Sequence, residues 1–364
     1  MRWAWSTTDL AGTANGVIVP RVAVIDRWLN AATTCTLELE PEQARTVAHG
    51  ALLKGWRQPD AGGDRVLRFS GRVADTSAAE DDSSSSVVAM VGDAFHGLTS
   101  RFLPDGAAIA APGGVVGQTP RELVSAAVQS LEGTVAPGVY APTTGLYVPL
   151  TGSSGPLRDR TYAPGKNVAE LITQLAEVDD GFWFTIDPYE GTLYDTALFS
   201  QITILYPESG GESGVSLERG AGTLGNLSGV EVSRMPPVNR VTARGAEDAD
   251  TTPSVVVSDV ASIVAYGMHE AVVSLPDVFD TATLEQHARD ALRPEPVTTM
   301  ALIPAPVLGP SPWDDIDVGE LLTVRLAGAS VQLQGVFSCR CTGMQVTVDS
   351  SGLESITGLT VEVR

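Results

Sequence analysis

The chain has 364 residues, of which 43% are hydrophobic and 18% charged, with 37 Gly and 23 Pro. This length predicts two or three domains, and the composition predicts a folded, turn-rich, mostly β protein rather than a disordered one. The formal net charge of -21 excludes the basic surface on which stable binding to nucleic acid or to an anionic membrane depends.

Residues 1–104 are a series of short β-like runs separated by Gly, Pro, Asp and Ser. The N-terminus lacks an apolar run of signal-peptide length, and nowhere do about 18 apolar residues follow one another. We therefore expect neither a cleaved signal nor a membrane span. In "TCTLELE" polar and apolar residues alternate, which is typical of a strand with one wet face and one buried face. The segment predicts an antiparallel barrel or sandwich.

Residues 105–201 have the pattern of a small α/β module. In "GQTPRELVSAAVQSLEG" Thr119 is the predicted N-cap, Pro120 stands at the first helical position, and Glu122 follows three residues after the cap. A second helix is predicted after Asn167 and ends at "DDG". "FWFTIDPYEGTLY" then predicts a hairpin, with "DPYEG" as its turn.

Residues 202–364 return to strand-like runs, including "ASIVAYGMHEAVVS". One helix is predicted near residues 281–292, in "DTATLEQHARDALRP", where Pro294 ends it. A short internal repeat, which we call the echo, places Gly71 in "RFSGRV" at the same spacing as Gly335 in "QLQGVF". Because a glycine inside a strand is typical of a bulge, the echo supports two similar barrels.

The local motifs of common enzymes are absent: there is no GxSxG, GxxxxGK[ST] or HExxH motif and no paired CxxC. The histidines are scattered singly, as His49, His96, His269 and His287. A catalytic dyad or a metal site would therefore have to be assembled by the tertiary fold, and we expect surface or packing roles for His269 and His287.

Two of the three cysteines, Cys339 and Cys341, lie two residues apart on one face of a predicted strand. Their expected Cα separation of about 6 to 7 Å is at the strained limit for a disulfide. With Cys35 in a separate strand-like run, buried free thiols are the prediction, and these fit folding in a reducing cytoplasm.

Adjacent acidic residues occur at Asp179 with Asp180 and at Asp314 with Asp315, and such pairs could in principle be glycosidase carboxylates. Neighbouring side chains point apart, however, and turn or cap chemistry already explains both pairs. We assign no catalytic, cofactor-binding or metal-binding residue from the sequence.

In the order and spacing of these elements, the chain resembles the baseplate hub proteins of long-tailed bacteriophages, also called tail-tip, tail-associated or minor tail proteins. The resemblance is carried by "RFSGRVADTS", "VVAMVGDAFHGLTSRFL", "GQTPRELVSAAVQ" and "NVAELITQLAEVDDGFWFTIDPYEGTLY". The later runs "NRVTARG", "IVAYGMHEAVVS", "TLEQHARDALR" and "DVGELLTVRL" extend it over nearly the whole chain.

The resemblance implies a mainly β fold with an α+β insertion. A first β-barrel tube domain would occupy residues 1–104, an inserted α/β module 105–201, and a second β-barrel domain 202–364. It implies a non-enzymatic structural protein of the virion tail tip, made in the host bacterial cytoplasm. It also implies a homotrimer that continues the tail tube and uses no cofactor. Its partners would be the tail tube, distal tail, fibre or spike and tape-measure proteins, with DNA passing only in transit.

Net charge adds a hypothesis to this resemblance. Three copies would carry 3 × (-21) = -63 formal charges. An acidic channel wall repels DNA, so the genome would slide through the ring during ejection rather than adhere to it.

Two other classes of function stay open. An adhesin that binds host carbohydrate is suggested by Trp183 and Tyr189, and by Tyr140 and Tyr147 in "GVYAPTTGLYVP", because aromatic rings form sugar-binding platforms. A cell-wall hydrolase of the tail tip is the third class, since some tail-tip proteins carry one.

Overall fold

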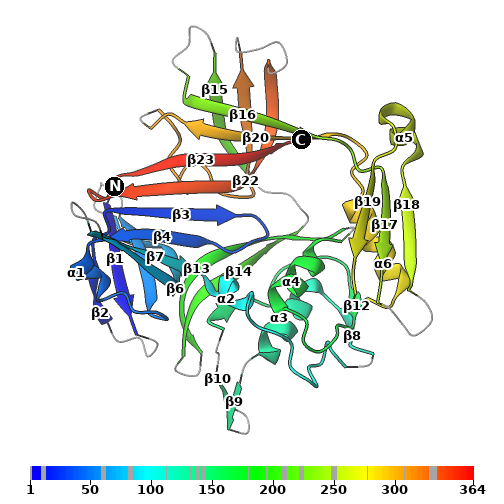
Figure 1. Ribbon diagram of the computed structural model, residues 1–364, viewed down its shortest axis with the longest axis horizontal. Coiled ribbons are helices and arrows are strands. Elements are labelled where there is room, and N and C mark those ends of the chain that lie inside the picture. Colours follow the sequence, from blue (N-terminus) through cyan, green and yellow to red (C-terminus); the bar gives the residue numbers. More distant parts are fainter. Residues whose placement is uncertain are drawn as a thin grey trace.

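The computed structural model describes residues 2–9, 14–58, 63–80, 85–111, 113–131, 133–136, 139–141, 144–178, 180–193, 196–206, 211–220, 225–246, 252–276, 278–306, 308–327 and 334–364. Most of its elements are strands, and the short helices are spread along the chain (Figure 1). The mainly β fold with a small α/β insertion, predicted from the sequence, is confirmed.

The first β part covers the N-terminal quarter of the chain, drawn in blue in Figure 1. Its apolar and polar residues alternate as the sequence predicts, so that the strand Thr34–Leu39 buries every second side chain. Its elements are β1 (Arg2–Thr8), β2 (Ala14–Ile18), β3 (Val22–Trp28), β4 (Thr34–Leu39), α1 (Pro41–Ala44), β5 (Leu52–Gln58), β6 (Val66–Glu80), β7 (Ser85–Gly92) and α2 (Ala94–Leu98).

The module follows, with its two longer helices packed against each other and a separate hydrophobic core. Thr119 and Glu122 form the predicted capping box, and Asn167 caps the second helix as predicted. Its elements are β8 (Val115–Gln118), α3 (Pro120–Ser130), β9 (Gly133–Ala136), β10 (Val139–Ala141), β11 (Leu146–Tyr147), β12 (Arg158–Arg160), α4 (Val168–Ala176), β13 (Trp183–Leu193) and β14 (Thr196–Leu205).

The turn predicted at "DPYEG" is wrong. Strand β13 runs through this segment and pairs with β14 up to Leu193, with a bulge between Pro188 and Gly191. A proline has no N–H to give to a ladder, and a bulge is one of the places where a strand tolerates it.

The residues of the predicted second barrel divide into two separately packed units. The second β part contains β15 (Glu212–Arg219), β16 (Leu227–Met235), β20 (Val297–Pro304), β21 (Leu321–Leu326), β22 (Gly335–Asp349) and β23 (Glu354–Val363). The peripheral unit, at the right of Figure 1, has its own small core and contains β17 (Arg240–Arg244), β18 (Ser254–Ser258), α5 (Val260–Tyr266), β19 (Glu270–Ser274) and α6 (Thr281–Ala291).

Helix α6 lies where the sequence predicts it, but α5 corrects the strand-like interpretation of "ASIVAYGMHEAVVS". The Asp259 side chain accepts a hydrogen bond from the Ser262 N–H and starts the helix. The Val- and Ile-rich composition suggested a strand, whereas the capping residue decides the local structure.

One sheet runs through both β parts. In the order β16-β20-β23-β22-β3-β4-β7-β6, each strand pairs antiparallel with the next. The junction between the two parts is the pairing of β22 with β3, in which Gln345 lies opposite Asp26. The strands of the two parts therefore form one continuous surface.

The two β parts repeat the same path. Each contains one strand of 15 residues, β6 or β22, that pairs first with one neighbour and then with another. Both strands have a bulge near the change of partner, between Val73 and Asp75 in β6 and between Cys341 and Gly343 in β22. The glycine near the change of pairing partner in β22 is thus Gly343. The similar spacing around Gly335 therefore does not align β22 with β6.

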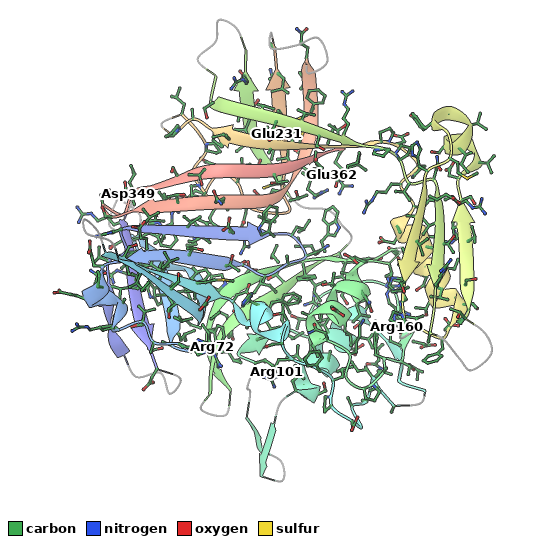
Figure 2. All side chains as sticks on the ribbon, in the orientation of Figure 1. Arg72, Arg101, Arg160, Glu231, Asp349 and Glu362 are labelled. Carbon is green, nitrogen blue, oxygen red and sulfur yellow. The ribbon has the colours of Figure 1, made fainter. Side chains whose placement is uncertain are left out.

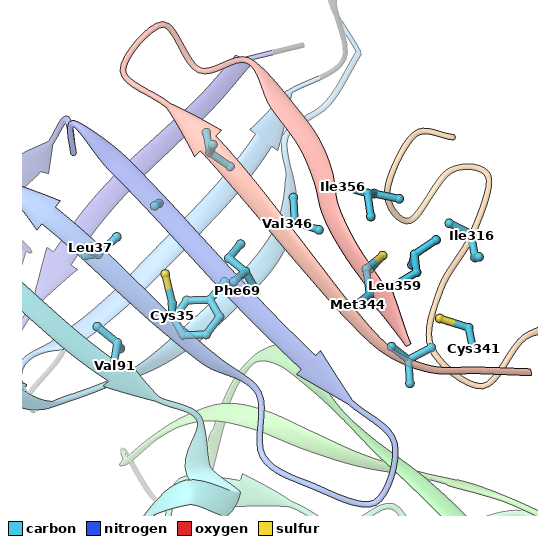
Figure 3. Close-up of a cluster of buried hydrophobic side chains, with 14 of the residues drawn as sticks. Cys35, Leu37, Phe69, Val91, Ile316, Cys341, Met344, Val346, Ile356 and Leu359 are labelled. Carbon is cyan, nitrogen blue, oxygen red and sulfur yellow. The ribbon is translucent and has the colours of Figure 1, made fainter. Parts of the chain in front are cut away.

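The two β parts also share one hydrophobic core. Phe69 and Val91 of the first part belong to the same buried cluster as Met344 and Leu359 of the second (Figure 3). The relative orientation of the two parts is therefore fixed by packing as well as by the strand pairing.

Candidate functional site

The run of eight strands from β16 to β6 has an unpaired edge at each end, and beyond it the first half of β6 continues the sheet to β5, β1 and β2. Strand β16 pairs with β20 on one side, and from Glu231 to Met235 no described strand pairs with its other side. The second half of β6, from Asp75 to Glu80, pairs with β7 only. Unpaired edges carry rows of free N–H and C=O groups, so they are templates for pairing with another chain.

The directions of the eight strands make these two edges compatible. Every neighbouring pair from β16 to β6 is antiparallel, and an even number of alternating strands leaves the two end strands running in opposite directions. An edge β6 placed beside the β16 of another copy would continue the antiparallel order.

The face of this sheet opposite the core carries acidic side chains among polar ones, with Trp28, Met90 and Met235 also exposed on it. Thr, Ser and Gln occupy many of its positions, and the acidic side chains come from six different strands, β3, β4, β6, β16, β22 and β23: Asp26, Glu38, Asp75, Glu231, Asp349 and Glu362. Figure 2 labels Glu231, Asp349 and Glu362 along the sheet. The basic residues at the described strand positions of this face are Arg72, which lies opposite Gly92, and Arg340, which is buried beneath Trp183. We call this surface the acidic face.

Three of these carboxylates have polar partners within the chain. Asp26 accepts a hydrogen bond from Gln345 at 2.8 Å, and Glu38 lies 3.5 Å from Arg21 at the edge of the face. A hydrogen bond from the Ser351 side chain, followed by backbone N–H groups, lowers the pKa of Asp349 from its usual value. These contacts favour the negatively charged form of Asp349.

The aromatic residues considered for sugar binding do not form one platform. Trp183 is 9% exposed, and the guanidinium groups of Arg340 and Arg364 lie 4.2 and 4.9 Å from its ring. Tyr147 and Tyr189 do come together, as stacked rings with centroids 4.8 Å apart. The side chain of Tyr140 lies outside the described part of the chain.

The acidic pairs have structural partners. Asp180 adopts a positive φ of 56° and accepts a hydrogen bond from the Tyr206 hydroxyl, whereas Asp179 lies outside the described residues. Asp314 forms an ion pair with Arg57 at 2.8 Å, and Asp315 accepts the N–H of Ser311. Asp314 and Asp315 therefore bind different groups.

The fold separates the four histidines into one pair and two single residues. His49 and His96 line the same cavity beside β6. His269 lies within 3.2 Å of the Tyr266 carbonyl in an exposed turn, and His287 is buried on α6. The prediction of surface and packing roles for His269 and His287 agrees with these positions.

Cys35, Cys339 and Cys341 are buried free thiols, as predicted. Burial raises the pKa of Cys341 to about 12, so its thiol stays protonated and unreactive at neutral pH.

Two negative findings concern the part of the chain that the structure describes. It contains no group of three or more His, Cys, Asp or Glu side chains placed to hold a metal ion. None of its helices is long and apolar enough to cross a membrane.

Sequence reasoning missed the acidic face itself. Its six carboxylates are spread from Asp26 to Glu362, and only strand pairing places them on one surface. The available signal was the alternation within each strand, which marks the wet positions but does not join the strands together.

No family model matches the chain, and no curated protein matches it in sequence. Among solved structures, its fold is similar to a tail protein of Neisseria meningitidis, with a TM-score of 0.54, 13% identity, and coverage of 100% of this chain and 97% of the other. It is similar to the prophage tail protein gp18 of Listeria monocytogenes, with a TM-score of 0.54, 9% identity, and coverage of 99% and 94%.

A third similar structure is the 43 kDa tail protein of prophage MuSo2 from Shewanella oneidensis, with a TM-score of 0.53, 14% identity, and coverage of 100% and 98%. The three likenesses extend over essentially the whole of each chain. The resemblance inferred from the sequence is therefore confirmed at the level of the fold, which is that of bacteriophage tail proteins.

Proposed function

We propose that the chain is a non-enzymatic structural hub of a bacteriophage tail tip, in which three copies form a closed ring that continues the tail tube. The observation that carries this proposal is the continuous antiparallel sheet with two unpaired and compatible edges. Pairing of β6 in one copy with β16 in the next would cover both of these edges, and the acidic face would line one side of the ring.

The repeat within the chain supplies the register of this contact. The bulges of β6 and β22 place Asp75 at the position of Gly343, and hence Ser77 at the position of Gln345. Inside the chain, Gln345 of β22 lies opposite Asp26 of β3.

The partner position on β16 follows from the same comparison. The strand order pairs β3 with β4 and β16 with β20, so β16 corresponds to β3. Following the paired residues from strand to strand in each β part places Ser233 of β16 at the position that Asp26 holds in β3. The contact between copies is therefore expected to place Ser77 of one copy opposite Ser233 of the next.

Disulfide trapping tests this register. Opposed residues of antiparallel strands have Cα atoms about 4.5 or 5.5 Å apart, within the range that a disulfide spans. The double variant S77C/S233C is expected to give covalent dimers and trimers, and nothing larger, on a non-reducing gel after mild oxidation. The native cysteines are buried, so they contribute little background.

Matched controls distinguish an incorrect strand register from a failure of the copies to assemble. Each single variant is expected to stay monomeric on the gel, and an equimolar mixture of the two is expected to stop at the dimer. A78C/S233C places the first thiol on the opposite face of β6 and is expected to remain uncrosslinked. Monomeric bands from S77C/S233C, together with a monomeric mass by light scattering and no rings in negative stain, would reject the ring.

The ring would have partners along the tail axis and DNA in transit. The acidic face supports a channel wall, because carboxylates from successive strands repel phosphates wherever DNA passes. We propose the tail tube and distal tail proteins on one side of the ring, fibre or spike proteins on the other, and the tape-measure protein within reach of the channel. The proposed location is accordingly the virion tail tip.

The cell-wall hydrolase is the rival that an activity assay distinguishes most directly. Asp315 and Glu354 line one cavity, but Asp315 accepts the N–H of Ser311 and Glu354 forms an ion pair with Arg57, so both carboxylates have structural partners. Zymography of the purified ring on host cell walls is expected to show no clearing. A cleared zone that co-purifies with the protein would overturn the non-enzymatic role.

A further inference from the structure

The peripheral unit presents an apolar surface on and just after α5. Val260 and Val264, one helical turn apart, are 71% and 82% exposed, and Tyr266 and Met268 at the end of the helix are exposed as well. No charged residue occurs between Val260 and Met268. Exposed apolar residues are ordinarily scattered singly, whereas a contiguous group is typical of an interface. We call these four residues the α5 patch.

The α5 patch is anchored close to the end of β16. The side-chain amide of Asn239, which follows β16 in the chain, donates to the Ser262 hydroxyl at 3.2 Å and to the Gly267 carbonyl at 2.7 Å. Asn239 is fully buried, so these contacts fix α5 to the segment that leaves β16. Figure 1 shows α5 at the top of the peripheral unit, near the point where the chain arrives from β16. A chain that pairs with the free edge of β16 therefore comes close to the α5 patch.

The first β part has a cavity beside its own free edge. The cavity has a volume of about 450 Å³ and is bordered by the middle of β6, by α2 and the turn after it, and by Phe199 of β14. Gly50, Arg72 and Ala74 belong to its walls. Phe102, which directly follows the residues of the turn that line the cavity, is 56% exposed.

The register proposed for the ring brings the α5 patch and the cavity to the same contact. With Ser77 of one copy opposite Ser233 of the next, continued antiparallel pairing puts Ala74 opposite Pro236. Ala74 lines the cavity, and Pro236 begins the segment that leads from β16 into the peripheral unit. The peripheral unit of the next copy would therefore start at the rim of the cavity.

The junction of β3 with β22 inside the chain is the internal counterpart of this contact. The matched bulges of β6 and β22 place Arg72 at the position of Arg340. Gly50 and Gly319 correspond as well, because each donates its N–H to the carbonyl of the residue after the matched arginine, at 2.9 and 2.8 Å. The surroundings of Arg340 and Gly319 therefore indicate what belongs over the cavity.

At this internal junction the counterpart of the cavity is covered. The guanidinium of Arg340 lies 4.2 Å from the Trp183 ring of the module. A Cβ at Gly319 would lie 3.2 Å from Leu205 and 3.8 Å from Leu29, which directly follows β3. The cover thus comes from the segment after β3 and from the module attached to the same β part. Because β16 corresponds to β3, the matching cover for the cavity is the peripheral unit that follows β16.

We propose that the α5 patch of one copy packs against α2 and the turn after it in the adjoining copy, and so closes the cavity beside β6. This contact rests on the proposed ring and adds to the pairing of the strand edges. Packing Val260 and Val264 against the exposed Phe102 removes apolar surface of both copies from water. Edge pairing uses main-chain groups that any strand offers, so the α5 contact supplies specificity for a second copy of this chain.

Photocrosslinking tests the contact directly. Position 264 is given the photoreactive residue p-benzoylphenylalanine, and ¹⁵N-labelled and unlabelled protein are mixed so that links between copies can be recognised by mass. Irradiation is expected to join position 264 of one copy to residues 94–102 of another. The same photoreactive residue at position 116, where Val116 of β8 is 62% exposed, is expected to give no link between copies. Links from position 264 only within its own chain, or only to another part of the adjoining copy, would overturn the proposal.

A matched pair of variants measures the contribution to assembly. V264D places a carboxylate against the apolar surface of the adjoining copy, and it is expected to raise the dissociation constant of the ring at least tenfold in analytical ultracentrifugation. V116D makes the same substitution at an exposed valine of the module and is expected to leave the dissociation constant unchanged. Both valines are exposed, so thermal unfolding of the two variants as monomers is expected to be the same.

The strand crosslink separates failure of this contact from failure of the ring. S77C/S233C reports the edge pairing and involves no residue of α5. If S77C/S233C gives covalent trimers while V264D and V116D assemble equally well, the ring stands and the α5 contact is rejected. If S77C/S233C stays uncrosslinked and the unmodified protein is monomeric, both the ring and the α5 contact are rejected.

Discussion

Arg57 of β5 and Glu354 of β23 form a buried ion pair although 297 residues separate them in the chain. The Arg57 Nε atom lies 2.8 Å from one Glu354 oxygen, and the two side chains are only 3% and 6% exposed. The same guanidinium group also binds Asp314, so one arginine of the first β part holds two acidic residues of the second.

Replacement of Arg57 is expected to uncouple the two β parts. R57L leaves the Glu354 carboxylate buried without its cation, and losing one partner of a buried pair costs about 3 to 5 kcal/mol. We expect a loss of this size in the free energy of unfolding measured in urea. R325L, which removes an exposed arginine 3.5 Å from Glu218, is expected to cost less than about 1 kcal/mol. Equal losses of unfolding free energy in R57L and R325L would show that the buried ion pair stabilises the protein no more than the exposed one does.

His287 is expected to make the attachment of α6 sensitive to acid. Burial, followed by the charge of Arg160, lowers the pKa of His287 to about 4, and its Nδ1–H donates to the Glu177 carbonyl of the module at 2.9 Å. A lowered pKa contributes stability that is fully present above the unfolded value of about 6.5 and is lost as the pH falls towards 4.

Hydrogen exchange of the α6 amides measures this effect. Between pH 7 and pH 5, the local free energy of opening is expected to fall by about 2 kcal/mol more in the unmodified protein than in H287N. The asparagine keeps a donor for the Glu177 carbonyl but does not titrate. A loss of the same size in H287N would assign the acid sensitivity to other groups.

Neutralising the acidic face is expected to slow DNA ejection from assembled phage. D26N, D75N and E231Q remove three carboxylates from three strands while keeping side chains of nearly the same shape. Weaker repulsion lets phosphates stay longer near the wall, so ejection followed by dye release is expected to take longer. E42Q, D64N and D105N, at exposed positions outside the sheet, remove the same number of charges and are the matched control. Unchanged kinetics in particles with normal tails would reject the role of the charge.

The stacked tyrosines test the adhesin alternative. Tyr147 and Tyr189 cover one ring face of each other, which leaves less aromatic surface for a sugar than two open rings would. We expect no binding of the purified protein on a glycan array of host surface saccharides. Binding that Y147A/Y189A abolishes, while W183A leaves it intact, would establish the adhesin instead.

Local signals in the sequence were reliable where a few neighbouring residues decide the structure. Thr119 and Asn167 start helices because their side chains accept the first free N–H groups, and alternation marks the wet and buried faces of each strand. The predictions that were wrong concern segments in which one local pattern is compatible with two structures. Pro188 fits a turn or a bulge, and the apolar run at Val260 fits a strand or a capped helix.

The sequence by itself determined the class of fold, the inserted module, and the buried thiols, because periodicity, capping and composition act over a few residues. The tertiary structure alone decided the junction of β3 with β22, the two open edges, the acidic face and the cavity around Arg72. Each of these depends on strands paired across hundreds of residues, as with Asp26 and Gln345. Such pairing is selected by the burial of one shared core, which no short stretch of sequence encodes.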